Sequence, residues 1–168
     1  MDISKSEVDR LFIYNPETGS LYCRVPFGRR KEGDPLGYVS NGRVVISLNN
    51  NHYLAHRIAW ISLHGEIPPG KYIDHINGNP LDNSIKNLRL CTHQQNMMNR
   101  KMHKNNSTGL KGVYFDGSRS GPNKWRAQIR VEGKKVSVGR FATKEEAHSA
   151  YLKASQKYHG QFAPSSVR

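Results

Sequence analysis

The pattern of apolar and polar positions is clearest in the last third of the chain. From residue 124 to 131 the two kinds alternate strictly, as in a strand with one buried face. Residues 132–133 form a turn, and the apolar face resumes at Val136 and Val138. Helical spacing follows Thr143, a suitable N-cap, and the first turn carries acidic residues. We therefore predict a three-stranded sheet packed on one helix, with its other face open and cationic.

Shorter elements are predicted in the first seventy residues. Two apolar-aromatic runs flank residues 15–19, which are turn formers and indicate a hairpin. Asn41-Gly42 favours a two-residue turn before a strand at residues 43–48. Apolar residues recur at helical spacing in residues 53–64, where Gly65 and the two prolines after it predict the end of a helix.

The segment from residue 71 to residue 103 predicts a strand, a loop, a second strand and a helix. Residues 71–76 and 88–91 are the two short strands, and the asparagine-rich residues 77–87 form the loop between them. Thr92 is a suitable N-cap for the helix at residues 93–103. Residues 104–112 are polar and contain two glycines. We therefore expect an α+β chain of two domains, residues 1–104 and 105–168, with a linker at about residues 104–110.

Charge indicates a polyanionic partner. The chain has 168 residues with 26 basic and 13 acidic side chains, a net charge of +13. Residues 105–168 alone carry 12 basic and 4 acidic side chains, a net of +8. Such a field attracts nucleic acid and accelerates its encounter.

Two other classes are excluded by the composition. No apolar run approaches the roughly 18 residues that span a bilayer, and no signal peptide is evident, so we expect a soluble intracellular protein without a membrane partner. Cys23 and Cys91 lack the spacing of a zinc site, so neither zinc nor a disulfide framework is expected.

One polar constellation carries candidate chemistry. Asp74 and His75 are neighbours on a predicted strand, Asn87 enters the returning strand, and Asn96 lies on the following helix. A carboxylate and an amide oxygen are hard ligands that suit Mg²⁺ or Mn²⁺. A neutral histidine can take a proton from water, and an asparagine can orient its ring. The four residues could together perform metal-assisted phosphodiester hydrolysis.

The string "AHRIAW…IPPG…IDHINGNPLDNSIKNLRLCTHQQN" resembles the HNH endonucleases, in the form typical of phage and intron homing enzymes, over residues 11–104. The resemblance implies a ββα-metal fold. It implies that His75 is the general base, that Asn87 orients it, and that Asp74 and Asn96 hold the metal. Magnesium is the expected ion, and manganese is expected to replace it.

The chain departs from the common HNH pattern at Asn96, where many members have histidine. His93 lies on nearly the same helix face and is a further candidate ligand or proton donor, although a phosphate- or solvent-facing role is favoured. Asn77 and Asn83 are interpreted as turn residues, Asp82 as a loop cap, and His56 as a packing or phosphate-contacting residue.

The motifs "WRAQIR", "VGRFAT" and "EEAHSAY" resemble the plant ethylene-response-factor (ERF) type of DNA-binding domain over residues 108–163. The resemblance implies a three-stranded antiparallel sheet lying in the DNA major groove. Tyr114 and Ser137 depart from the plant pattern, so base preference is not carried over. The alternation and the resemblance together predict these DNA contacts: Lys111, Lys124, Arg126, Gln128, Arg130, Lys135, Ser137 and Arg140.

The sequence thus favours a metal-dependent endonuclease acting on double-stranded DNA as a monomer or weak dimer, in the cytoplasm of a phage-infected bacterial host. A DNA-binding regulator with a decayed nuclease domain is the main alternative. An RNA-binding protein is a second alternative.

Overall fold

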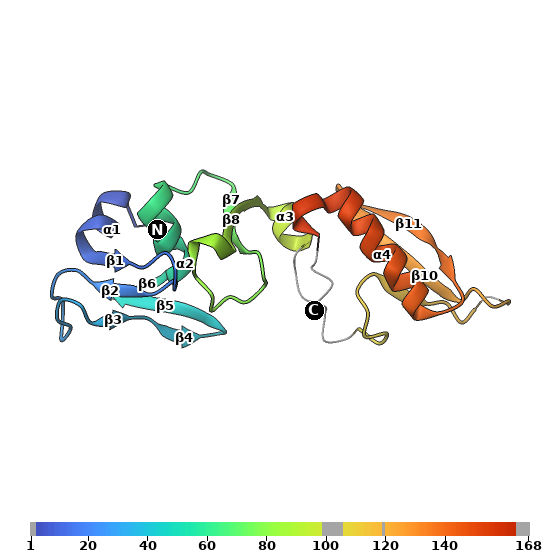
Figure 1. Cartoon of the computed structure of the whole chain (residues 1–168), viewed down its shortest axis with the longest axis horizontal. Coiled ribbons are helices and arrows are strands. Elements are labelled where there is room, and N and C mark those ends of the chain that lie inside the picture. Colours follow the sequence, from blue (N-terminus) through green and yellow to red (C-terminus); the bar gives the residue numbers. More distant parts are fainter. Residues whose placement is uncertain (1–2, 99–105, 119, 164–168) are drawn as a thin grey trace. The chain divides into compact units, whose positions relative to one another are not determined.

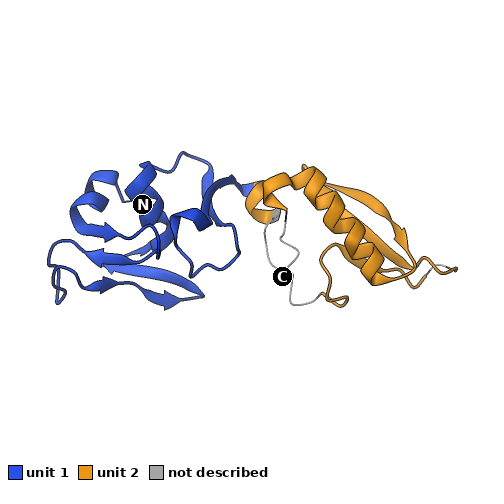
Figure 2. Cartoon of the chain, viewed as in Figure 1, with its two compact units in different colours: residues 1–93 blue, residues 94–168 orange. Residues whose placement is uncertain are grey.

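The computed structural model describes residues 3–98, 106–118 and 120–163. The chain divides into two units, residues 1–93 and 94–168 (Figure 2). The predicted domain boundary at residue 104 falls later, and residues 99–105 lie outside the described residues. The predicted linker therefore stays a prediction, as does the helical conformation of residues 99–103.

Both units combine helices with small antiparallel sheets, in agreement with the predicted α+β class (Figure 1). Sheet order in the first unit is β1-β2-β3, β4-β5-β6 and β7-β8. Its elements up to the second sheet are α1 (Lys5–Leu11), β1 (Phe12–Tyr14), β2 (Leu21–Cys23), β3 (Pro35–Leu36), β4 (Tyr38–Ser40), β5 (Arg43–Leu48) and β6 (Asn51–Leu54). Then follow α2 (Ala55–His64), β7 (Lys71–His75), η1 (Ile85–Asn87), β8 (Leu88–Thr92) and α3 (His93–Met98), the last of which continues into the second unit.

Local sequence explains the turns of this unit. Asn41 and Gly42 both have positive φ, at 49° and 70°, as a tight hairpin turn between β4 and β5 requires. The predicted hairpin at residues 15–19 joins β1 to β2. Helix α1 was not predicted, although its capping box between Ser4 and Glu7 is a readable signal.

Helix α2 links the core to the β7–β8 hairpin. Ile58 and Ile61 pack in the main cluster with Val8, Phe12 and other residues of α1 to β5. Ala59 belongs to a second cluster with Ile73 of β7 and Leu88 of β8. Because one rigid helix supplies both contacts, the hairpin is held at a defined place against the core.

The second unit has the predicted sheet on one helix. Its elements are β9 (Val113–Phe115), β10 (Trp125–Val131), β11 (Lys134–Phe141), α4 (Lys144–His159) and η2 (Gly160–Phe162), with sheet order β11-β10-β9. Ala127 and Ile129 of the sheet pack on Ala147 and Tyr151 of α4. A Cβ at Gly112 would lie 2.1 Å from the Tyr151 ring, so only glycine fits there.

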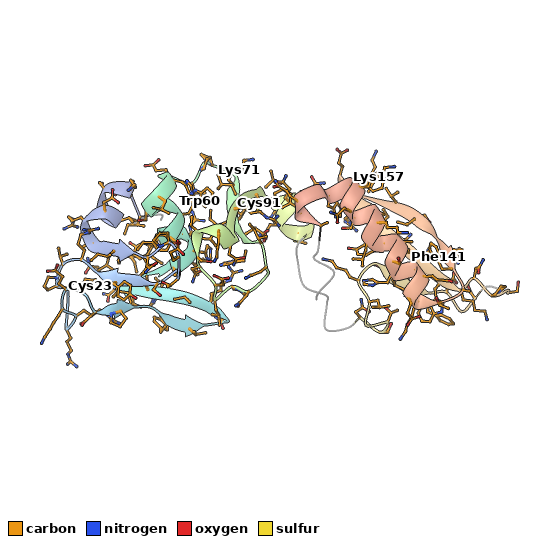
Figure 3. The ribbon with its side chains drawn as sticks, in the orientation of Figure 1. Cys23, Trp60, Lys71, Cys91, Phe141 and Lys157 are labelled. Atoms are coloured by element: carbon orange, nitrogen blue, oxygen red, sulfur yellow. The ribbon has the colours of Figure 1, made fainter. Side chains whose placement is uncertain are left out.

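The two cysteines are buried thiols on different sheets, Cys23 on β2 and Cys91 on β8 (Figure 3). Burial raises the pKa of both thiols, Cys91 to about 11. Among the described helices, none is long and apolar enough to cross a membrane.

Candidate active site

The antiparallel register of β7 and β8 sets the geometry of the site. Asp74 lies opposite Arg89, and His75 lies opposite Leu88. Asp74 and His75 are both buried, each with 6% of its surface exposed. Neighbours on a strand point to opposite faces, so the two side chains meet different surroundings.

The His75 ring is held by a neighbouring loop and by α2. Its Nε2 lies 3.1 Å from Oδ1 of Asn83, an acceptor, so Nε2 carries the proton and Nδ1 carries the lone pair. The Asn83 amide nitrogen faces the Leu81 carbonyl at 3.4 Å, which supports this orientation of the amide. His56 meets the His75 ring edge-to-face, with the ring centroids 5.1 Å apart. Asn83 is interpreted from the sequence as a turn residue, which its bond to the Leu81 carbonyl fits, and its contact with His75 is an additional finding of the tertiary structure.

Electrostatics keep both histidines neutral near pH 7. Burial lowers the pKa of His75 below its ordinary value of 6.5, and the hydrogen bond to Asn83 opposes this shift. Burial also lowers the pKa of His56, to about 3, with the nearby His75 as the next cause. A neutral His75 is the form that can accept a proton. Of the two roles expected for His56, packing and phosphate contact, its burial favours packing.

Asn87 ties the loop that follows His75. Its Oδ1 accepts from the Asn77 backbone N–H at 2.8 Å, and its Nδ2 donates to the Asp82 carbonyl at 2.7 Å. Both bonds go to the loop, so direct orientation of His75 by Asn87 remains a prediction.

Asp82 shapes the same loop. One of its oxygens accepts from the Ser84 hydroxyl at 2.6 Å and from the Ser84 backbone N–H at 3.2 Å. Its other oxygen accepts from the Asn77 amide at 2.7 Å. The hydrogen bonds from Ser84, against a smaller opposing effect of burial, lower the pKa of Asp82. These bonds give Asp82 the expected part of a loop cap.

Asp74 is paired with Arg89, a residue that sequence reasoning missed. Arg89 donates from Nε at 2.9 Å and from Nη2 at 2.7 Å, both to Oδ2 of Asp74. The Asp74 side chain is 7% exposed and that of Arg89 is 13% exposed, so a buried carboxylate is paired with a partly buried guanidinium. Counting back from the predicted strand ends, residues 76 and 88, would have placed Arg89 opposite His75, so the Asp74–Arg89 pairing is a finding of the tertiary structure.

The metal-binding prediction rests on few residues. Asp74 offers a buried carboxylate, and its hard oxygens fit Mg²⁺ or Mn²⁺. Within the described ranges no three His, Cys, Asp or Glu side chains gather in a way that could hold a metal ion. A site with one carboxylate and one amide would leave the other coordination positions to water and phosphate, which Mg²⁺ accepts.

The two predicted helical ligands lie on α3. His93 is exposed, and its ring lies beside the Tyr72 ring with the centroids 5.7 Å apart. Asn96 is half-buried and belongs to the second unit. Their roles as ligands, and the ββα arrangement that would bring α3 to the hairpin, therefore stay predictions.

In the second unit, six of the residues predicted to contact DNA form three cross-strand pairs between β10 and β11. The pairs are Arg126 with Arg140, Gln128 with Ser137, and Arg130 with Lys135. The two other predicted contacts, Lys111 and Lys124, come just before β9 and β10. Arg140 also pairs with Asp116 at 2.9 Å, and Arg126 lies over the Tyr114 ring at 5.8 Å.

A register shift aligns these pairs. Simple alternation along β11 would put Ser137 and Arg140 on opposite faces, because they are three residues apart. The structure has a bulge-type irregularity where Ala127 pairs with Gly139 and Gln128 pairs with Ser137, so Val138 is passed over. The extra residue brings Arg140 to the same face as Ser137.

Known proteins resemble the chain in the segment that holds this site. A family model described as HNH endonuclease matches residues 53–98. Protein 3.8 of Escherichia phage T7 is 37% identical over 110 residues, which cover 64% of this chain and 86% of that protein. An uncharacterized HNH endonuclease of Acanthamoeba polyphaga mimivirus is 30% identical over 127 residues, covering 75% of this chain and 64% of the relative.

A third relative, from a Bacillus subtilis (strain 168) prophage, has "HNH homing endonuclease" in its name. It is 32% identical over 95 residues, covering 56% of this chain and 55% of the relative. The chain thus spans less than two thirds of the last two relatives, and no solved structure matches it. Enzymes of the HNH family typically use a divalent metal ion. The segment matched by the family model contains β7, the Asp74–His75 pair and β8, so the match covers the site itself. The chain therefore belongs to the HNH endonuclease family and is a nuclease.

Proposed function

We propose that the protein is a metal-dependent endonuclease that hydrolyses phosphodiester bonds in double-stranded DNA, in the manner of a phage homing endonuclease. The observation that carries this proposal is the buried His75, whose Nε2 is held by Asn83 Oδ1, with the buried carboxylate of Asp74 as the preceding residue on β7. Water activation near a metal-bound phosphate requires a neutral, fixed imidazole and a hard oxygen donor, and these two adjacent residues supply them.

In this mechanism His75 is the general base. Its Nδ1 accepts a proton from the attacking water, while the Nε2–H bond to Asn83 Oδ1 keeps the ring in the required tautomer. The positive ring that results is stabilised by the hydrogen bond to Asn83 and by the charges of Asp74 and Asp82, which all act to raise the pKa of His75.

Asp74 and Asn96 would hold the metal ion, with His93 as a further candidate. A bound Mg²⁺ or Mn²⁺ would supply charge stabilisation at the phosphate. Asp74 contributes a carboxylate that the Arg89 guanidinium orients through Oδ2.

The sheet of the second unit is proposed to place the nuclease on DNA. The three cross-strand pairs on β10 and β11 offer four cationic side chains and two neutral hydrogen-bonding ones on one face. Arginine and lysine contact phosphates, while arginine and glutamine also read base edges. The resemblance to ERF-type domains supports the same face of the sheet as the DNA-contacting one.

Plasmid nicking tests the enzymatic part of the proposal. Wild-type protein with Mg²⁺ should relax supercoiled plasmid, and His75→Ala should not. His64→Ala is the matched control, because His64 is an exposed histidine at the end of α2. Equal activity of wild type and His75→Ala would refute the proposed base, and binding without cleavage by the wild type would favour a DNA-binding regulator.

A further inference from the structure

The turn that joins β1 to β2 contacts the loop that holds His75. Three contacts join residues 14–19, here named the hairpin clamp, to residues 83–85. Tyr14 donates its hydroxyl to the Asn83 carbonyl at 2.8 Å, and Ile85 donates its N–H to the Pro16 carbonyl at 3.0 Å. At Gly19 a Cβ would lie 2.4 Å from the Asn83 carbonyl carbon, so the two backbones pack without room for a side chain.

We propose that the hairpin clamp is a positioning device for the general base, acting through Asn83. The clamp fixes the Asn83 backbone, and the Asn83 side chain in turn accepts from Nε2 of His75. Tyr14 and Gly19 are thus positioning residues, since neither contacts the reacting atoms. The inference rests on the proposed role of His75, and it concerns residues that lie outside the segment matched by the family model.

The clamp is itself rigid and anchored in the core. Asn15 Oδ1 accepts from the N–H groups of Glu17 and Thr18, and Gly19 closes the turn with φ at +75°. The flanking strands carry Phe12, which is 2% exposed, and other core residues. Motion of the turn would therefore require movement of the core.

The clamped loop, in contrast, has little apolar packing near its tip. Ile76 and Leu81 are 43% and 46% exposed, whereas Asn83 and Ser84 are 3% exposed. The position of the loop is thus set by its internal polar bonds and by the clamp. The clamp meets the loop at Asn83, which also contacts the base.

Tyr14 can donate its hydrogen bond to Asn83 over the whole pH range in which the enzyme would be assayed. Burial, with a contribution from the Asp82 charge, raises the pKa of the Tyr14 hydroxyl to about 12. The hydroxyl therefore stays protonated and remains a donor to the Asn83 carbonyl.

Tyr14→Phe tests the inference with the loss of one oxygen atom, because the ring keeps its packing against both core clusters of the unit. We expect kcat for plasmid nicking to fall about 10-fold, since small displacements of a catalytic group cost up to about 100-fold in rate. KM for DNA and the Kd for Mn²⁺ should stay unchanged. Tyr22→Phe, in the adjoining strand β2, is the matched control and should keep wild-type kcat.

A double-mutant cycle tests whether the effect passes through Asn83. If it does, Tyr14→Phe should add nothing to the loss caused by Asn83→Ala, because the coupled residues act in series. Full additivity of the two losses, or a wild-type kcat in Tyr14→Phe, would overturn the inference.

Ring-nitrogen NMR of His75 gives a readout that needs no activity. Wild type should show the Nε2-protonated tautomer, and Tyr14→Phe should show a mixture of tautomers; an unchanged spectrum would overturn the inference. An inactive His75→Ala with an unaffected Tyr14→Phe would refute the clamp alone. Wild-type nicking by His75→Ala would refute the proposed base instead.

Discussion

Arg89→Met tests whether Arg89 stabilises the negative charge of Asp74 when no metal is bound. Methionine preserves much of the arginine stem but removes the two hydrogen bonds of 2.7 and 2.9 Å to Oδ2 of Asp74. The carboxylate would then be buried without its guanidinium partner. Removing one member of a buried ion pair costs about 3–5 kcal/mol in the free energy of unfolding.

For a unit of this size, each kcal/mol corresponds to about 4–8 °C in Tm. We therefore expect Arg89→Met to melt at least about 12 °C below wild type in buffer with EDTA. Added Mn²⁺ should raise Tm more in the variant than in wild type, because the ion supplies the positive charge that Arg89 no longer provides.

The assay is thermal denaturation followed by circular dichroism, with and without Mn²⁺. Lys5→Met is the matched control, since Lys5 and Asp9 form an exposed ion pair on α1 that is worth about 0.3–0.5 kcal/mol. Adding Asp74→Asn to Arg89→Met should restore part of the stability, because the charge that Arg89 compensated is then gone. Equal Tm values for Arg89→Met and Lys5→Met in EDTA would refute the reasoning.

Three further predictions concern pH, salt and capping. The pKa of His56 is about 6.5 in the unfolded chain but about 3 in the folded protein. The contribution of His56 to the free energy of unfolding is therefore complete above pH 6.5, and it falls by up to about 1.4 kcal/mol for each pH unit below 6.5. His56→Phe should make Tm depend less on pH between pH 6.5 and 4, and parallel plots of Tm against pH for the variant and wild type would contradict this. Arg126→Ala should reduce the slope of log K against log salt for DNA binding by about 1, whereas Lys153→Ala, on the exposed side of α4, should not. Thr143→Ala removes the capping box of α4 and should lower the free energy of unfolding by about 1 kcal/mol, measured by denaturant unfolding. An unchanged unfolding midpoint would show that the cap does not stabilise the protein.

Several strands, turns and helices could be predicted from short stretches of sequence, because local residue preferences determine them. The alternation at residues 124–131 predicted β10 and its two faces, since side chains in a strand have a period of two. Asn41-Gly42 predicted the β4–β5 turn, and Thr143 predicted the start of α4. In each case a residue preference that acts within about four positions was enough.

The partners of the site residues could not be read in this way. Asn83 and Asn87 both lie in an asparagine-rich loop, and nothing in their order shows that Asn83 meets the His75 ring. That contact depends on the hairpin clamp, whose Tyr14 is 69 residues away along the chain. The bulge that turns Arg140 to the face of Ser137 likewise depends on pairing between two strands.

The sequence by itself determined the α+β class, most of the strands and helices, the cationic sheet of the second unit and the Asp74–His75 pair with its family resemblance. Only the tertiary structure decided that Arg89 neutralises Asp74 and that Asn83 holds His75. Chain-local preferences act over a few residues, whereas these contacts arise from strand register and from packing between segments far apart in the sequence.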